Sequence, residues 1–114
     1  PKKNLISSNT IREKVIKARN FQLERFEKMK IKIYSNSQIP SSKIKEICNL
    51  SEKGNKILEN AMQKFGFSAR AYDRILKVGR TIADLERSEN IENHHIAEAI
   101  QYRSLDRESW GSTK

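Results

Sequence analysis

Hydrophobic residues recur at three- and four-residue steps over most of this chain, the spacing that brings side chains to one face of an α-helix. The apolar/polar alternation of a half-buried strand persists nowhere in the sequence. The pattern therefore predicts an all-α fold, a bundle of five helices joined by short loops.

The first helix is expected to begin at Thr10, which forms a capping-box pattern with Glu13. Arg12, Arg19 and Arg25 fall in a broad polar stripe along this helix. The opposite, core-facing stripe consists of Ile11, Val15, Ala18, Gln22, Phe26 and Met29.

The helical period is lost from Lys30 to Pro40, which predicts a loop. Ser41 or Ser42 can cap a short helix after it. The buried positions of that helix are Ile44, Ile47 and Cys48. Ser51 then opens a third helix, and Gly66 stands where a left-handed C-cap glycine is expected. The apolar stripe of the third helix is Ile57, Leu58, Ala61, Met62 and Phe65.

Ser68 is expected to cap the most strongly patterned helix, the spine of the domain. Its inward stripe is Tyr72, Ile75, Leu76, Gly79, Ile82, Ala83 and Leu85. Its outward, solvated stripe is Arg70, Asp73, Arg74, Lys77, Arg80, Asp84 and Arg87. Within it, Asp73 and Lys77 are spaced to form an i, i+4 ion pair. Asn93 can cap a last helix. The apolar residues of that helix are Ile96, Ala99, Ile100 and Leu105.

We place the domain boundaries by apolar content. Residues 1–9 have too few apolar side chains to be buried and are expected to form a linker, 10–106 the helical domain and 107–114 a polar tail. A chain of 114 residues is too short for a nucleotide-binding α/β domain together with this bundle. The start at Pro1, not a methionine, suggests a piece of a longer polypeptide.

The charge balance favours an anionic partner. Lys and Arg number 23 against 14 Asp and Glu, a formal net charge of +9. Such a charge attracts nucleic acid, nucleotide phosphates or an acidic protein surface without choosing among them. Cys48 is the only cysteine, so the chain can form no internal disulfide, and we expect a cytoplasmic location. No apolar run is long enough to cross a membrane, and no membrane partner is expected.

The residues offer no complete catalytic machinery. No glycine-rich GxxxxGK[ST] loop is present, so the chain cannot hydrolyse ATP by itself, and we assign it no catalytic residue. The only histidines, His94 and His95, are adjacent and do not share a helix face. Glu98 is the one candidate to join His94 at a metal, and we expect no metal site. Tyr72 and Tyr102 are expected to pack in the core or at its rim, because no basic residues alternate with them as in single-strand binders.

The most specific signal is the stretch SARAYDRILKVGRTIADL at residues 68–85, followed by HIAEAIQYR at 95–103 and RSLDRESW at 103–110. These segments resemble the C-terminal domain of magnesium-chelatase-related AAA+ ATPases, in the ComM/YifB branch. The resemblance extends over about residues 8 to 110, through an upstream VxxARxxQxxRF-like helix with Val15, Ala18, Arg19, Gln22, Arg25 and Phe26. Two positions depart from the family pattern, Gly79 in place of alanine and Phe67 in place of leucine.

The resemblance implies a helical lid that follows an AAA+ core in the same polypeptide, within a ring that is expected to be a homo-hexamer. The full-length protein would bind ATP with Mg²⁺, whereas this piece alone would bind no cofactor. In such a lid, Arg70 matches the sensor-2 arginine that contacts the nucleotide, and Arg74 is the backup candidate. Arg12 and Arg19 are candidates for contact with a neighbouring subunit. For Arg70, Arg12 and Arg19, a solvated surface charge is the alternative interpretation.

The resemblance also bears on what the parent protein does. Its branch suggests a DNA-processing motor of the branch-migration or helicase type, so that DNA is a candidate partner, whereas the older family label suggests magnesium insertion into a porphyrin. The alternative from a different class is a freestanding basic DNA-binding module, although Asp73 and Asp84 dilute the basic stripe of its best recognition helix. An adaptor for an acidic protein is a third hypothesis without a motif of its own.

Overall fold

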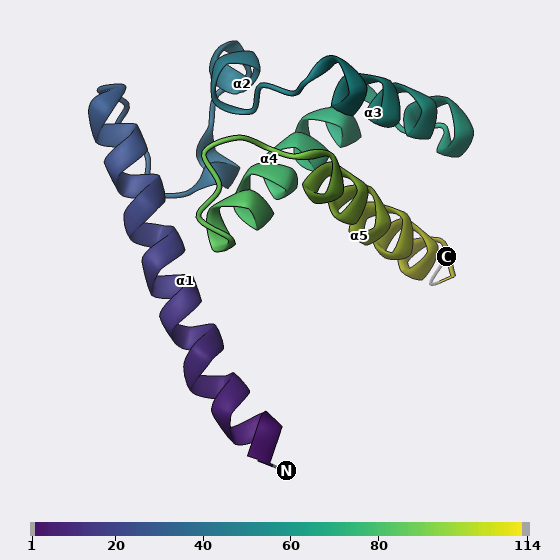
Figure 1. The fold of residues 1–114 in the computed structure, drawn as a ribbon. Coiled ribbons are helices and arrows are strands. Elements are labelled where there is room, and N and C mark those ends of the chain that lie inside the picture. The colour runs from purple at the N-terminus through teal and green to yellow at the C-terminus, as the bar shows by residue number, and fades with distance from the viewer. Residues whose placement is uncertain (1, 113–114) are drawn as a thin grey trace.

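The computed structural model describes the backbone of residues 2–112 and the side chains of residues 9–103. Within this part of the chain the fold is all-α, as predicted, and the only extended pairing is an isolated parallel bridge between Leu50 and Ile91. The elements in chain order are α1 (Lys2–Lys28), the 3-10 turn η1 (Asn36–Gln38), α2 (Ser41–Ile47), α3 (Glu52–Phe65), α4 (Ala69–Leu85) and α5 (Asn93–Ser112) (Figure 1).

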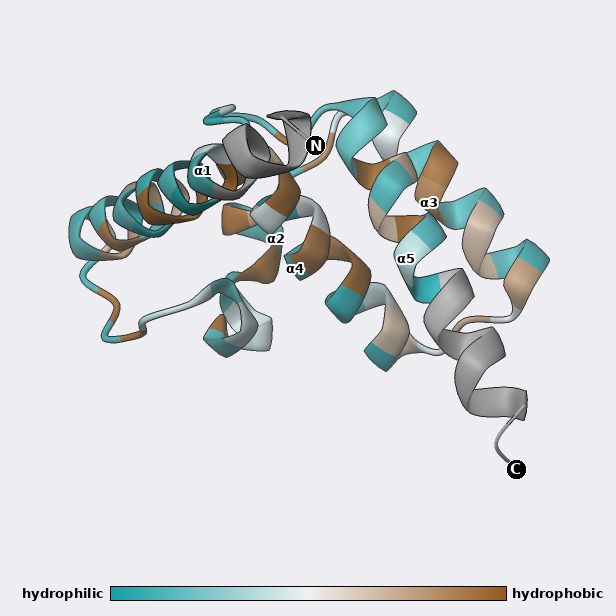
Figure 2. Cartoon of the chain, turned by 90° about the horizontal axis from the view of Figure 1, so that it is seen from below, coloured by the Kyte–Doolittle hydropathy of each residue, from teal (hydrophilic) through white to brown (hydrophobic). Residues whose placement is uncertain are grey.

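Helix α4 is the central element of the bundle, as the sequence predicts for the spine. It packs against α1, η1, α2 and α5, while α3 packs against α5. Hydrophobic and hydrophilic positions alternate around the helices, as amphipathic helices require (Figure 2). The largest fully buried apolar side chains come from five different parts of the chain: Phe26, Ile39, Leu58, Ile75 and Ile96. Together with Ile44 and Ile47 of α2, they belong to one core to which all five α-helices contribute side chains.

The predicted ends of α3 and α4 are confirmed. The Ser51 hydroxyl accepts a hydrogen bond from the Gly54 amide at 3.1 Å, and the Ser68 hydroxyl accepts one from the Ala71 amide at 3.2 Å. Both serines satisfy an amide that the first helical turn leaves unpaired. Gly66 ends α3 in the left-handed conformation, with φ 64°, which a side chain would strain.

Helix α1 differs from the prediction at its N-terminal half. It begins at Lys2, so the capping box expected at Thr10 is wrong. Ala18 and Phe26 are buried, but Ile11 and Val15 of the same stripe are 58% and 44% exposed. The physical reason is length, because this half of α1 extends away from the other helices (Figure 1). The domain boundary at residue 10 stays a prediction.

The other predicted caps are also wrong. Helix α2 already begins at Ser41, after an extended Pro40 that forms no side-chain cap. Asn93 is the first residue of α5, not its cap, and its side chain accepts a hydrogen bond from Ser51 at 3.3 Å. The tail predicted from residue 107 is helical as far as Ser112. The side chains of Leu105 and of this tail lie outside the described residues.

At Gly79 the backbone of α4 lies close to side chains of α5. A Cβ atom at this position would lie 2.9 Å from Cδ1 of Ile96, a side chain that is fully buried. A mid-helix glycine weakens a helix by up to about 1 kcal/mol relative to alanine. Here the bare backbone of Gly79 leaves room for Cδ1 of Ile96 to pack directly against α4.

A buried carboxylate holds the spine helix in place. Asp84, near the end of α4, is 0% exposed. Its Oδ1 accepts hydrogen bonds from Arg25 Nη2 of α1 at 2.6 Å and from Arg80 Nε at 3.0 Å. Its Oδ2 accepts from Arg25 Nη1 at 3.2 Å and from the side chain of Asn36 in η1 at 2.9 Å. One carboxylate thus joins α1, η1 and α4.

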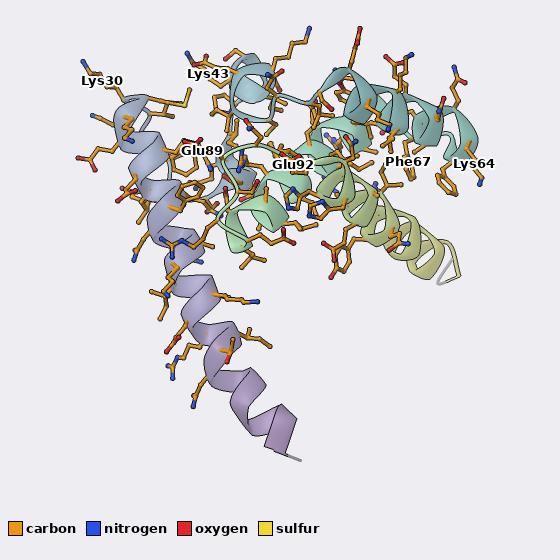
Figure 3. The ribbon with its side chains drawn as sticks, in the orientation of Figure 1. Lys30, Lys43, Lys64, Phe67, Glu89 and Glu92 are labelled. Atoms are coloured by element: carbon orange, nitrogen blue, oxygen red, sulfur yellow. The ribbon has the colours of Figure 1, made fainter. Side chains whose placement is uncertain are left out.

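Arg80 extends this network to the connection between α4 and α5. Its two terminal nitrogens donate to the backbone carbonyls of Ser88 at 2.6 Å and Glu89 at 2.9 Å. Figure 3 shows Glu89 on that connection and Glu92 where it meets α5. Burial lowers the pKa of the Arg80 guanidinium, and the Asp84 charge opposes this shift. With all three of its nitrogens paired, Arg80 fixes the path of the chain into α5.

The outward stripe predicted for α4 is therefore wrong at two positions. Arg80 is 3% exposed and Asp84 is 0% exposed, because α1, η1 and the α4–α5 connection cover the end of the helix that carries them. The ion pair expected between Asp73 and Lys77 is also absent among the described residues. Lys77 instead donates to the backbone carbonyl of Ser37 at 3.1 Å.

Replacing Asp84 by Asn should destabilise the fold by about 3 to 5 kcal/mol, because two arginines would lose their shared counter-charge and one of them is buried. Chemical denaturation of both proteins measures this difference in the free energy of unfolding. Asp73→Asn, the same change on the same helix, should cost less than about 0.5 kcal/mol. Equal effects of the two substitutions would contradict a structural role for the network.

Candidate functional site

Arg70 lies in the first turn of α4, two residues after the Ser68 cap. Its side chain is exposed, as is that of Arg74 one turn further along the helix. The first turn of a helix carries partial positive charge and amides that no helical carbonyl accepts. A cation in this turn is unfavourable on its own, so the position of Arg70 favours a bound anion.

Arg70 and Arg74 line a groove of about 1080 Å³ between α4 and α5. The structure thus brings together the two sequence-predicted nucleotide-contact residues. The other residues that line the groove form an apolar floor from both helices and a polar edge that reaches η1. They are Ser37, Asp73, Ile75, Lys77, Val78, Thr81, Ile82, Ala99, Tyr102 and Arg103. The hydrogen bond from Lys77 to Ser37 closes the η1 edge. The groove is thus cationic at its rim and apolar beneath.

Arg12 and Arg19, the predicted inter-subunit residues, lie elsewhere. Both are exposed on α1 and neither lines the groove. A subunit contact through them stays a prediction.

Tyr102 is a groove residue that the linear sequence did not reveal. Tyr72 packs against the core as predicted, but Tyr102 is 59% exposed and lines the groove together with both arginines. Basic residues do not alternate with Tyr102 along the sequence, but in the folded domain Tyr102 shares the groove with several of them. Only the packing of α4 against α5 brings the tyrosine into one groove with Arg70 and Arg74, and no spacing along the chain indicates this.

A second polar cluster forms where α4 ends and α5 begins. Glu86 Oε1 lies 3.1 Å from His94 Nε2 and 2.9 Å from His95 Nε2. These three side chains offer ligand atoms within 4.8 Å of one another. Glu86, not the predicted Glu98, therefore accompanies the histidines. As expected from the sequence, one histidine is packed and the other solvated: His95 is 0% exposed and the side chain of His94 is 63% exposed.

The hydrogen bonds of His95 argue against metal binding at this cluster. Its Nδ1 accepts a hydrogen bond from the Glu92 amide at 2.8 Å, so the proton of a neutral ring is on Nε2 and is donated to Glu86. A metal at Nε2 would need that nitrogen unprotonated, which would move a proton to Nδ1 and point it at an amide donor. His95 instead stabilises the start of α5, in the way a capping-box glutamate does.

Comparison with known proteins places the chain in a family. The family described as the C-terminal part of magnesium chelatase, subunit ChlI, matches residues 6–103. Competence protein ComM of Haemophilus influenzae is 45% identical over 101 residues, and protein YifB of Escherichia coli is 38% identical over the same length. Each alignment covers 89% of this chain and 19% of the relative. No solved structure matches the chain significantly.

The fold and the matched segment define an all-α domain of the magnesium-chelatase C-terminal class. The chain belongs to this family, in its ComM/YifB-like branch, which confirms the resemblance found in the sequence. It spans about a fifth of the length of these relatives. Among the described residues, no helix is long and apolar enough to cross a membrane.

The cluster of Glu86, His94 and His95 should make the stability of the domain depend on pH. Hydrogen bonds from His95 and His94 lower the pKa of Glu86 below its ordinary value of 4.5. A carboxyl with a lowered folded-state pKa stabilises the fold above its unfolded pKa, and this contribution is lost as the pH falls through the lowered value. The stability difference between wild type and Glu86→Gln should therefore shrink from about pH 5 to about pH 3.

Urea denaturation at each pH measures this difference. Because Glu86 is half exposed, we expect at most about 1 kcal/mol at the upper end of the range. Glu98→Gln, on the exposed side of α5, is the matched control and should show no such trend. A stability difference for Glu86→Gln that stays constant with pH would refute the assignment.

Proposed function

We propose that this domain is the lid of an ATP-driven AAA+ motor, in which Arg70 contacts the γ-phosphate of ATP bound to a core elsewhere in the full-length protein. The observation that carries the proposal is the position of Arg70, exposed in the first turn of the central helix. Membership of the ComM/YifB-like branch supports the same assignment.

The electrostatics of the site suit a phosphate. A guanidinium presents planar, permanently charged donors that match phosphate oxygens, and the amides of the first helical turn add to the attraction. A bound γ-phosphate would also relieve the repulsion between Arg70 and the helix terminus. The gain in binding therefore depends on the γ-phosphate and disappears when hydrolysis releases it.

The rigidity of α4 allows this contact to move the whole domain. Asp84, at the far end of the helix from Arg70, links α4 to α1 and η1, and Arg80 links it to the connection into α5. A force applied at Arg70 is thus transmitted to several elements at once. Formation and loss of the phosphate contact would rotate the lid as a rigid body relative to the core.

The remaining parts of the proposal rest on the family to which the chain belongs. ATP with Mg²⁺ is the cofactor of the full-length protein, and a homo-hexameric ring is its working assembly, with Arg12 and Arg19 available to a neighbouring subunit. Arg74 takes the role of Arg70 if the lid docks one helical turn further along α4. We infer that the parent protein processes DNA, and magnesium insertion is the competing role.

The test is ATP hydrolysis by the full-length protein carrying Arg70→Ala. Loss of a charged donor to the transferred phosphate should reduce kcat roughly 100-fold. Arg70→Lys keeps the charge but not the two-pronged geometry and should recover only part of the rate. Thermal unfolding of this domain should be unchanged, because Arg70 is exposed.

Arg74→Ala is tested beside Arg70→Ala as the backup candidate, and Lys56→Ala, exposed on α3 and outside the groove, is the matched control. If only Arg74→Ala lost turnover, the phosphate contact would be assigned to Arg74, one helical turn further along α4. Unchanged turnover in both Arg70→Ala and Arg74→Ala would reject the sensor role for this helix.

A further inference from the structure

The groove between α4 and α5 contains an exposed aromatic ring that the proposed ATP contact does not use. Tyr102 of α5 is 59% exposed and lines the groove with Arg74 of α4. Val78, also exposed at 38%, adds apolar surface to the same lining. A tyrosine and an arginine, both exposed in the lining of one groove, offer a stacking face and a charged donor.

The charge of the groove points to an anion. Among the residues whose side chains the structure describes, its lining has four cations, Arg70, Arg74, Lys77 and Arg103, and one carboxylate, Asp73. Lys77 already donates one hydrogen bond to Ser37, which holds its ammonium at the η1 edge. The chain as a whole carries a formal charge of +9, so the surrounding field has the same sign.

The apolar component of the groove restricts which anion fits. A lone phosphate would use the arginines but leave the tyrosine ring and Val78 unmatched. A nucleotide unit with an unpaired base matches both parts, since every base has a face that stacks on an aromatic ring while its phosphate pairs with a cation. Bases within a duplex are already stacked on their neighbours and present only their edges to a protein.

We propose that this groove binds single-stranded nucleic acid, with a base stacked on Tyr102 and an adjacent phosphate held by Arg74. The interaction goes beyond the proposed ATP contact because it needs neither nucleotide nor the rest of a motor. Arg70, at the end of the groove nearest the helix start, remains available to the γ-phosphate.

The test is fluorescence anisotropy of the chain of 114 residues with a labelled oligo-dT of about 16 nucleotides. Tyr102→Ala should weaken binding roughly tenfold, the loss expected when one stacked base is released. Tyr102→Phe, which keeps the ring, should bind like the wild type. Tyr34→Ala is the matched control, because Tyr34 is 74% exposed but does not line the groove.

The arginine is tested through salt dependence. Arg74→Ala should lower the affinity and reduce the slope of log K against log salt by about 0.7, the value for one phosphate contact on a single strand. Arg12→Ala, an exposed arginine outside the groove, should change both quantities less. Duplex DNA of the same length should bind more weakly and be indifferent to Tyr102.

Three results would overturn the proposal: binding that is unaffected by Tyr102→Ala, equal losses for Arg74→Ala and Arg12→Ala, or binding to the duplex that is as tight as to the single strand. The first would mean that no base stacks on this ring, and the second that a diffuse positive field attracts the strand. Because no ATP is present, failure here leaves the ATPase assay of Arg70→Ala as a separate test.

Discussion

The structure depends on one carboxylate placed where no water reaches it. A buried charge is costly unless it is fully paired, and Asp84 meets this condition with Arg25, Arg80 and Asn36 as partners. Because those partners come from α1, α4 and η1, the pairing can form only when the three elements have docked. The same requirement makes the end of α4 rigid, and the groove and Arg70 inherit their orientation from that helix.

The position of α5 and the groove between α4 and α5 follow from this arrangement. Arg80 fixes the connection after Ser88, which sets where α5 starts, and His95 then stabilises its first turn. Close contact at Gly79 allows α5 to pack against α4, so that Tyr102 lines one groove with the arginines of the spine helix. Arg70, Arg74 and Lys77 of α4 supply most of the charge of the groove, and the packing of α5 adds Tyr102 and Arg103 to it.

Local signals in the sequence predicted both ends of α3 and the start of α4, but not the starts of α1, α2 and α5. The serine caps at Ser51 and Ser68 and the glycine at Gly66 act through neighbouring residues, so a short window contains the whole interaction. Asp84 could not be assigned this way, because its partner Arg25 lies 59 residues away and polar residues at helical spacing resemble a solvated face. The cap of α5 was misplaced for a related reason, since histidine performs the role that glutamate or glutamine usually fills.

Only part of the candidate site could be predicted from the sequence. Arg70 and Arg74 were found because they share a helix face and a motif, whereas Tyr102 belongs to the groove only through tertiary packing. Periodicity can also predict burial where none occurs. Ile11 and Val15 have the spacing of core residues but are exposed, because no other element of the described chain covers that half of α1.

The proposed role of Arg70 is to distinguish ATP from ADP by contact with the γ-phosphate. The most direct measurement is a titration of the full-length protein, wild type and Arg70→Ala, with a fluorescent ATP analogue and with the matching ADP analogue. We expect the substitution to weaken binding of the triphosphate by roughly tenfold or more and to leave the diphosphate unchanged, because only the triphosphate offers the oxygens that the guanidinium contacts. Equal weakening of both nucleotides, or of neither, would contradict the account.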